Sequence, residues 1–301
     1  MGFVSSDDSR HFVTTVAGAE SNLAAALATL GCRVRWVSRV GADALGRLIV
    51  REVEGRGVDV VVERDPIKPT GVLVRHVSDG HTSVRYYRSD SAARGLGPGA
   101  IDLAGTAAWC HFTGITPAVS TSAADLVMTI CDRAGTPAGN LSFDVNFRPA
   151  LWADAATAAE TLLQLARRAD VVFVGDDESE ALFGTTDTGE LAHLLLHDDG
   201  QELVLKRGRG PASLVTRSDV VTEPGADTVV VDPTGAGDAF AAGYLAGRIS
   251  GLPPRRRLRL AHFMGARAVG ALDDAVRPLS EVEFEELVSA GLVRRREARE
   301  V

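Results

Sequence analysis

Short apolar runs alternate along the chain with longer stretches in which alanine and leucine recur at helical spacing. The apolar runs are rich in valine and aromatic residues, and they predict buried or half-buried strands at 34–38, 109–113, 141–145, 171–174 and 202–206. The stretches between them predict helices at 20–30, 44–55, 118–134, 153–168 and 178–182. Strands that alternate with helices in this way favour a mostly parallel central sheet with helices on both faces, which is a three-layer α/β/α fold.

Residues 70–88 depart from this pattern, because apolar and polar residues alternate there one by one. The sequence Ser78-Asp79-Gly80 lies between two such runs, which predicts a β-hairpin. A hairpin does not fit a chain of parallel strands and crossover helices, so we assign it to a small β-lid that projects from the main sheet. Residues 11–16 are the predicted partner strand. We therefore expect a single domain over 1–301, with a lid formed by about 9–17 and 68–90.

Charge limits the classes of partner. The 301-residue chain has 32 Lys and Arg against 40 Asp and Glu, a formal net charge of −8. A protein that binds the phosphate backbone needs a basic surface, so nucleic acid is excluded as the main partner. The segment 279–301 predicts a helix and a tail in which glutamate separates the arginines, which is typical of a solvated surface.

Cysteine usage and hydropathy indicate the compartment. Cys32, Cys110 and Cys131 lie far apart and form no C-x-x-C pair, which argues against a disulfide framework or zinc site and favours a reducing environment. His193 and His197 are four residues apart and are interpreted as a helix surface pair. The chain has no apolar run of membrane-spanning length and no signal-peptide pattern at its start. We predict a cytoplasmic protein with no membrane partner.

Residues 231–247, which read V-D-P-T-G-A-G-D-A-F-A-A-G-Y-L-A-G, carry the clearest chemical pattern. They follow a β-type run at 227–231 and lead into a helix of small residues. The backbone N–H groups of Gly235, Ala236 and Gly237 and the positive end of the helix dipole suit a phosphate group. Asp238 is a candidate general base for a hydroxyl nucleophile. The pattern predicts phosphoryl transfer to an alcohol, whereas a Gly-x-Gly turn without this context is usually only a tight turn.

This segment resembles the C-terminal signature of the ribokinase-like (PfkB) carbohydrate kinases, Asp-Thr-x-Gly-Ala-Gly-Asp followed by x-Phe. The match comprises Asp232, 234–238 and Phe240, with Pro233 in place of the usual threonine, and the resemblance extends over roughly 16–278. It implies a ribokinase-like fold with a β-lid, ATP and Mg²⁺ as cofactors, Asp238 as catalytic base, an anion hole at 235–237, and Thr234 in the nucleotide site. It also implies a homodimer formed through the lid.

Two further segments resemble the sugar-binding parts of the family. Gly18 allows close backbone approach, and Asn22 can offer a donor and an acceptor to sugar hydroxyls. Taken alone, the two residues are more typical of a glycine turn and a polar residue at the start of a helix. They resemble the family's first Gly-Gly-x-x-x-Asn motif, with Ala17 replacing the first glycine. The segment at 86–93 resembles the Tyr-Tyr-Arg…Ser-Ala element of 2-keto-3-deoxygluconate kinases, which implies that Tyr86 and Arg88 hold the substrate. A lid strand with an exposed arginine and a stacked tyrosine is the alternative.

Asp144, Asn146 and Arg148 occupy alternate positions at the end of a predicted strand, and a period of two would place them on one face. Ligands bind beyond the carboxyl ends of strands in open α/β sheets, so this predicts a polar site, with a structural ion pair as the alternative. The run resembles the same stretch of 2-keto-3-deoxygluconate kinases and fructokinases, which implies that Arg148 contacts the substrate or the transferred phosphate.

The predicted nucleotide turn follows the strand at 202–206. The resemblance implies that Lys206 approaches phosphates and that Gly208 and Gly210 let the backbone pass near the nucleotide. The family's Asn-x-x-Glu motif at the Mg²⁺ site aligns with 175–178, where the asparagine is missing. Glu178 remains as an indirect metal residue, and Asp176 or Asp177 is the expected substitute. No P-loop and no G-x-G-x-x-G pattern occurs.

The predicted function is ATP-dependent phosphorylation of a hydroxyl of a sugar acid, 2-keto-3-deoxygluconate first among them. Arginine binds a carboxylate through a planar fork, and a neutral sugar needs no such partner. Leu73 stands where these kinases often have an aromatic residue, so a fructokinase or ribokinase type is the first alternative. A non-catalytic sugar or nucleotide sensor is the second, because the asparagine and the family's first apolar strand are both missing. We expect an N-terminally extended chain to be more stable or more active.

Overall fold

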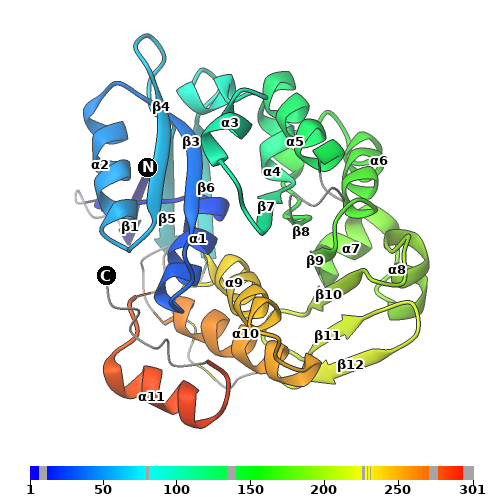
Figure 1. Cartoon of the computed structure of the whole chain (residues 1–301). Helices are drawn as coiled ribbons and strands as arrows, with labels where there is room; N and C mark the ends of the chain where they lie inside the picture. The colour runs from blue at the N-terminus through cyan, green and yellow to red at the C-terminus, as the bar shows by residue number, and fades with distance from the viewer. Residues whose placement is uncertain are drawn as a thin grey trace. The chain divides into compact units, whose positions relative to one another are not determined.

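The computed structural model describes residues 1–6, 12–78, 81–133, 140–225, 228, 230, 232–270 and 277–293. The chain forms two compact units: unit 1 comprises residues 1–95 and 228–301, and unit 2 comprises residues 96–227 (Figure 1). Within the described part of the chain, no helix is both long and apolar enough to cross a membrane.

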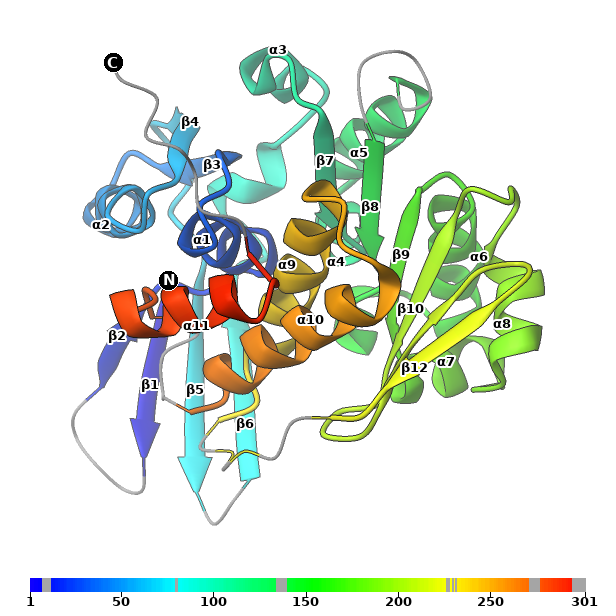
Figure 2. The same cartoon turned by 60° about the horizontal axis from the view of Figure 1, so that its bottom comes forward.

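Unit 2 contains a six-stranded sheet in the order β12-β11-β10-β9-β8-β7 (Figure 2). Four neighbouring strands run parallel: β7 (Trp109–Thr113), β8 (Asn140–Asp144), β9 (Val171–Gly175) and β10 (Glu202–Lys206). The antiparallel strands β11 (Ala212–Val215) and β12 (Val220–Glu223) follow β10. The prediction of a mostly parallel sheet is confirmed. Its central strand β9 is a continuous apolar run, because both of its faces are buried.

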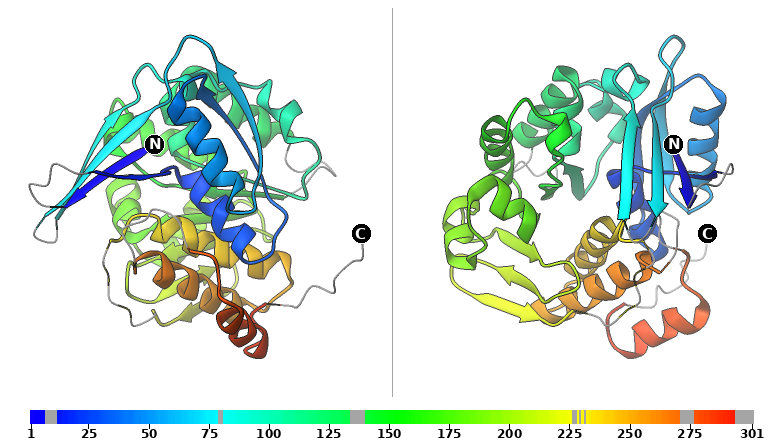
Figure 3. Two further views of the ribbon diagram at one scale, coloured as in Figure 1. Left: turned by 90° about the vertical axis from the view of Figure 1, so that its left-hand side faces the viewer. Right: turned by 180° about the vertical axis from the view of Figure 1, so that it is seen from behind.

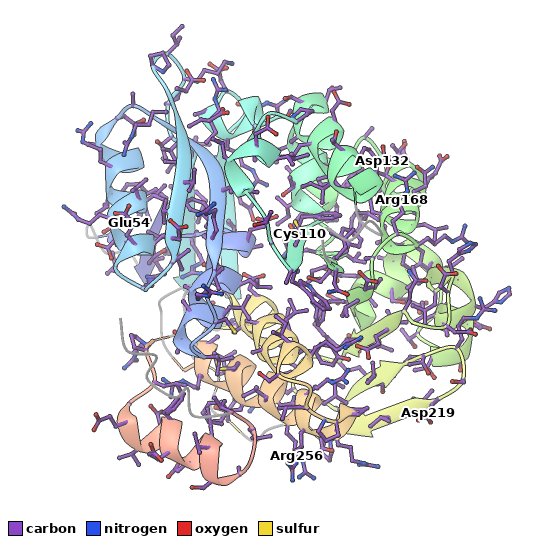
Figure 4. All side chains as sticks on the ribbon, in the orientation of Figure 1. Glu54, Cys110, Asp132, Arg168, Asp219 and Arg256 are labelled. Atoms are coloured by element: carbon purple, nitrogen blue, oxygen red, sulfur yellow. The ribbon has the colours of Figure 1, made fainter. Side chains whose placement is uncertain are left out.

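The helices of unit 2 are α3 (Ala100–Ala104), α4 (Ile115–Val119), α5 (Thr121–Arg133), α6 (Ala155–Ala166), α7 (Asp176–Phe183) and α8 (Thr188–Leu195), with a 3-10 turn at Pro149–Leu151. Leucines of α6 and α8 pack against the apolar side chains of β8, β9 and β10 in one core. On the surface, Asp132 of α5 and Arg168 form an ion pair at 3.0 Å (Figure 4).

Two local predictions in unit 2 were wrong. The helix expected at 118–134 is divided, because Ser120 has an extended backbone and its Oγ accepts a hydrogen bond from the amide of Ala123 at the start of α5. The interpretation of His193 and His197 as one helical face fails because α8 ends at Leu195, so His197 lies beyond the helix.

Unit 1 contains a four-stranded sheet in the order β2-β1-β5-β6, formed by β1 (Gly2–Ser6), β2 (Val13–Thr15), β5 (Val72–Ser78) and β6 (His81–Tyr87) (Figure 2). β5 and β6 are antiparallel, which confirms the hairpin, although Asp79 and Gly80 of its turn lie outside the described residues. β1 was not predicted. It lies between β2 and β5, so β2 pairs with β1 and not with the hairpin itself.

A second sheet of unit 1 consists of the parallel strands β3 (Arg35–Gly41) and β4 (Asp59–Asp65), joined by α2 (Ala44–Glu54). The other helices are α1 (Ala19–Thr29), α9 (Ala236–Ile249), α10 (Pro254–Ala268) and α11 (Glu281–Ser289), with a 3-10 turn at Ala92–Gly95. α9 and α10 lie side by side (Figure 3), and a Cβ on Gly243 would come within 2.6 Å of the Leu260 carbonyl oxygen. α11 confirms part of the predicted C-terminal helix, while residues 294–301 lie outside the described residues.

Candidate active site

The glycine-rich turn before α9 has the backbone that its sequence requires. Gly235 is the N-cap residue with φ of 77°, a left-handed conformation that glycine adopts without strain. No side chain of the described residues caps this helix. The Ala236 amide donates to the Pro233 carbonyl at 3.3 Å, whereas the Gly235 and Gly237 amides have no acceptor among the described residues. Two of the three predicted anion-hole amides are therefore available to a ligand.

The Asp232 side chain stabilises this turn through hydrogen bonds to Thr234. Its Oδ1 accepts hydrogen bonds from the Thr234 amide at 3.0 Å and from the Thr234 hydroxyl at 2.7 Å. Thr234, which was predicted to bind nucleotide, thus uses its hydroxyl within the turn. Residues 227, 229 and 231 of the β-type run expected before the turn lie outside the described residues.

Two predicted site residues that are far apart in the sequence meet in unit 1. The Asn22 Nδ2 group in the first turn of α1 donates to Asp238 Oδ2 at 2.9 Å, and Asp238 lies in the first turn of α9. Asn22 is 5% exposed, and its Oδ1 is buried with no hydrogen-bond partner among the described residues. Gly18 precedes the same helix, and its carbonyl accepts from the Asn22 amide at 2.8 Å. A buried acceptor without a donor, next to a carboxylate, is suited to a hydroxyl-bearing ligand.

Arg75 is a member of this region that the sequence did not reveal. It lies in β5, is 1% exposed, and places its Nη2 atom 3.0 Å from Asp232 Oδ2. The signal was present, because Arg75 falls in phase with Leu73 in an alternating strand and so replaces an apolar residue on the buried face. The alternation of apolar and polar residues predicted the hairpin, but not a buried charge within it.

Tyr86 lies at the end of β6, Arg88 directly follows this strand, and the two side chains contact each other. The Arg88 guanidinium carbon lies 4.2 Å from the centre of the Tyr86 ring, a cation–π geometry. Arg88 is half-buried, and Tyr86 is 39% exposed. The ring therefore holds the guanidinium plane in a defined orientation.

At the carboxyl ends of the strands in unit 2, Lys206 of β10 donates to both carboxylate oxygens of Asp144 of β8, at 2.8 and 2.9 Å. The Asp144 side chain is 2% exposed and that of Lys206 is 17% exposed, so this is a nearly buried ion pair. Lys206 was predicted to approach phosphates, and in the structure its ammonium group holds Asp144. The structural ion pair that was the alternative for this strand end is present.

Glu178 lies beside this pair at the start of α7. Its two oxygens accept hydrogen bonds from the amides of Phe147 and Gly175, each at 2.8 Å, and Arg148 Nη1 lies 3.8 Å away. Burial raises the pKa of Glu178 above its usual value, and the positive charge of Lys206 opposes that shift.

The predicted alternation of Asp144, Asn146 and Arg148 on one face was wrong. β8 ends at Asp144, and Asn146 has φ of 39°, which turns the chain out of the strand direction. Asn146 is buried, with Oδ1 lacking a partner among the described residues, whereas the Arg148 side chain is 45% exposed and donates to the Phe147 carbonyl. Gly208 and Gly210 lie in the turn after β10, closed by a 2.7 Å hydrogen bond from the Gly210 amide to the Arg207 carbonyl.

Comparison with known proteins gives these arrangements a context. The model of the pfkB family carbohydrate kinases matches residues 3–276. A 2-dehydro-3-deoxygluconokinase of Bacillus subtilis is 37% identical over 269 residues, which are 87% of this chain and 83% of the relative. A 2-dehydro-3-deoxygluconokinase of Thermoproteus tenax is 38% identical over 287 residues, which are 93% of this chain and 87% of the relative.

Solved structures agree on the fold. A PfkB protein from Polaromonas sp. JS666 has a TM-score of 0.82 and 30% identity, with 96% of each chain covered. An uncharacterized sugar kinase from Pyrococcus horikoshii, solved in complex with ATP, has a TM-score of 0.82 and 23% identity, with 96% of this chain and 94% of that chain covered. The predicted ribokinase-like fold is confirmed.

Proposed function

The chain belongs to the pfkB family of carbohydrate kinases and is a sugar kinase, and from this premise we propose that it transfers the γ-phosphate of ATP to a hydroxyl of a sugar acid. We propose 2-dehydro-3-deoxygluconate (2-keto-3-deoxygluconate) as that sugar acid. The two relatives that bear this name, at 37% and 38% identity, support the substrate.

The observation that carries the proposal is the 2.9 Å hydrogen bond between Asn22 and Asp238. It joins a residue predicted to bind the sugar to the residue predicted to act as base. The buried Oδ1 of Asn22 is the matching acceptor for a sugar hydroxyl. Since Asn22 donates to one oxygen of the carboxylate, it also fixes the orientation of Asp238 relative to that sugar.

The proposed chemistry follows from these positions. The substrate hydroxyl transfers its proton to the Asp238 carboxylate as the hydroxyl oxygen attacks the γ-phosphorus, and ADP leaves. The amides of Gly235 and Gly237, at the positive end of α9, stabilise the negative charge on the transferred group. The left-handed backbone of Gly235 directs these donors before the substrate arrives, so little reorganisation is needed during transfer.

ATP as donor is supported by the ATP complex of the Pyrococcus horikoshii sugar kinase, which has the same fold. We place the nucleotide against the turn that contains Gly208 and Gly210. Mg²⁺ normally binds phosphate oxygens, waters and one or two carboxylates, and it neutralises charge on the phosphates. Glu178 fits an indirect role through such waters, because both its oxygens already accept amide hydrogen bonds. Asp176 and Asp177 start the same helix and supply further carboxylates.

A sugar acid, and not a neutral sugar, is proposed because of Arg88. Its guanidinium is half-buried and stacked on Tyr86, an arrangement that presents a planar donor fork to a carboxylate. Arg148 remains a predicted contact of the substrate or the transferred phosphate. The cytoplasmic location and a homodimer formed through the sheet that contains β5 and β6 also remain proposals.

The test is ADP release by the purified protein with ATP, Mg²⁺ and, in turn, 2-dehydro-3-deoxygluconate, fructose, ribose and adenosine. We expect turnover with the sugar acid only. Turnover with fructose or ribose alone would keep the Asp238 chemistry and overturn the role of Arg88. Sugar binding without ADP release would contradict catalysis and identify a sensor.

Replacement of Arg88 separates these substrate classes. We expect Arg88→Ala to raise the KM for the sugar acid by roughly 100-fold, because a charged hydrogen-bonded pair contributes up to about 3 kcal/mol. Arg85→Ala removes the same charge from an exposed position in β6, three residues before Arg88, and should leave KM unchanged. Equal effects of the two substitutions on KM would show that only net charge matters.

A further inference from the structure

The ion pair between Arg75 and Asp232 is the most completely buried pair of opposite charges in the described part of unit 1. The two side chains are 1% and 2% exposed, and Arg75 is among the largest fully buried side chains. A buried ion pair contributes little net stability, since an apolar pair of similar volume often gives an equally stable fold. Stability alone therefore does not account for a charged residue in the middle of β5.

The position of Asp232 suggests what the pair does. Asp232 Oδ2 faces Arg75, and Asp232 Oδ1 holds the amide and hydroxyl of Thr234. Thr234 directly precedes Gly235, whose left-handed backbone opens α9. One oxygen of the carboxylate thus lies at ion-pair distance from the guanidinium, and the other oxygen accepts the hydrogen bonds that hold Thr234 at the start of the turn.

Charge gives a second argument. A lone carboxylate three residues before Gly235 would repel an anion at the amides of this turn, and a low-dielectric interior would strengthen that repulsion. Arg75 cancels the negative charge of Asp232 while leaving its hydrogen bonds to Thr234 in place. The ion pair therefore keeps the two hydrogen bonds that the Asp232 carboxylate accepts from Thr234, and it removes the net negative charge that would repel a phosphate group.

We propose that Arg75 is a positioning residue for phosphoryl transfer, which orients Asp232 and neutralises it so that the turn at 234–237 can bind the phosphate group. This inference rests on the proposed function of that turn. The proposed effect of Arg75 is on the phosphate group, whereas Arg88 is proposed to bind the sugar acid.

The first test compares the two halves of the ion pair by NMR. The amide resonances of Gly235 and Gly237 are followed in ¹⁵N-labelled protein while inorganic phosphate is added. We expect saturable shifts in the unmodified protein. Arg75→Met leaves the Asp232 charge uncompensated and should weaken phosphate binding by roughly tenfold. Asp232→Asn keeps an acceptor for Thr234 and removes the negative charge, so binding should be no weaker. Arg75→Met with Asp232→Asn should restore it.

If the Arg75–Asp232 pair only stabilised the fold, the variants would affect phosphate affinity differently. Loss of either partner would then loosen the turn, and both single variants would bind phosphate more weakly by a similar factor. That result, or an unchanged affinity in Arg75→Met, would overturn the proposal. If Arg75→Met does not fold, as judged by circular dichroism, the same decision follows from Asp232→Asn and from Arg75→Lys, which keeps the charge and should keep most of the phosphate affinity.

Kinetics supply the second test. Because the turn acts on the transferred group, Arg75→Met should lower kcat by roughly tenfold or more and leave the KM for 2-dehydro-3-deoxygluconate nearly unchanged. Arg39→Met is the control, since it removes an arginine that pairs with Glu63 and Asp65 elsewhere in unit 1, and its kcat should stay normal. A change in KM alone for Arg75→Met would contradict the positioning role.

The outcomes separate this inference from the proposed function. Phosphate-dependent shifts that Arg75→Met weakens, in a protein that turns over none of the sugars, would retain the inference and reject the proposed substrate. An absence of shifts at Gly235 and Gly237 in the unmodified protein would reject the phosphate site and the inference with it.

Discussion

Asp238 is the residue on which turnover should depend most. Asp238→Asn keeps the size of the side chain and removes the proton acceptor, so we expect kcat to fall by roughly 100-fold or more with little change in KM. The measurement is steady-state ADP release. Asp59→Asn, which alters an exposed acid of β4, is the control and should keep normal kcat. Turnover of Asp238→Asn within a few-fold of normal would remove Asp238 as the base.

Lys206 provides a prediction about stability. Its removal leaves the Asp144 carboxylate buried without its cation, so Lys206→Met should lower the free energy of unfolding by about 3–5 kcal/mol. Adding Asp144→Asn should recover much of that loss, because no buried charge remains. Urea denaturation measures both effects. Lys68→Met breaks the exposed pair with Asp90 and should cost less than about 1 kcal/mol. Equal losses in the two lysine variants would contradict this assignment.

At the scale of the elements, the C-terminal end of β4 is held by hydrogen bonds to the Asp65 carboxylate. Asp65 accepts hydrogen bonds from the amides of Ile67 and Lys68 at 2.9 and 2.8 Å and from Arg39 at 2.8 Å. These donors, the Lys68 amide first, lower the pKa of Asp65 from 3.8 to about 2. The pKa in the folded protein therefore lies below that of the unfolded chain, and the carboxylate stabilises the fold above about pH 4.

The dependence of the free energy of unfolding on pH, measured in acid, tests the contribution of the Asp65 carboxylate. As the pH falls from about 4 to about 2, Asp65 binds a proton and its contribution to stability disappears. Asp65→Asn should be less stable than the unmodified protein at pH 6, and the difference should shrink as the pH falls toward 2. Urea midpoints across that range give the comparison. A difference that does not depend on pH would show that the hydrogen bonds matter and the charge does not.

The positions of strands that are continuous apolar runs could be predicted from the sequence, whereas those of strands with several charged residues could not. β9 was predicted to within one residue, because it is buried on both faces and is a continuous run of apolar residues. β4 was missed because Glu63, Arg64 and Asp65 make its second half polar. Arg39 of β3 pairs with the carboxylates of Glu63 and Asp65. Such tertiary compensation has no local signal in the sequence.

For the whole molecule, resemblance to a family located the candidate site better than local pattern did. Asn22 and Asp238 are 216 positions apart in the sequence, and only the resemblance to the family's motifs predicts that both belong to one site. The same knowledge gave no indication of the Arg75–Asp232 pair, because neither residue shows its partner in the sequence. It also assigned Lys206 to phosphate, where the structure pairs it with Asp144.

Exposed apolar side chains support the proposed homodimer. Val13 on the edge strand β2 is 66% exposed, and Val84 and Tyr87 on β6 are 42% and 58% exposed. If this sheet forms the contact, Val13→Asp should convert a dimer to a monomer in light scattering coupled to size-exclusion chromatography, because the contact would bury a charge. Ile67→Asp alters an 89% exposed side chain outside the sheet and should leave the mass unchanged. A dimer that survives Val13→Asp would place the contact elsewhere.

The division of unit 1 into residues 1–95 and 228–301 has a consequence for how the protein is made. A ribosome adds about 5–20 residues per second, so the segment 96–227 occupies on the order of 10 s of synthesis. Throughout that interval α1 has emerged without α9, the helix whose Asp238 it binds, and apolar residues such as Leu23 and Leu27 lack their native surroundings. Residues 1–95 therefore wait longest for the rest of their unit, and the Asn22–Asp238 pair forms only near the end of translation.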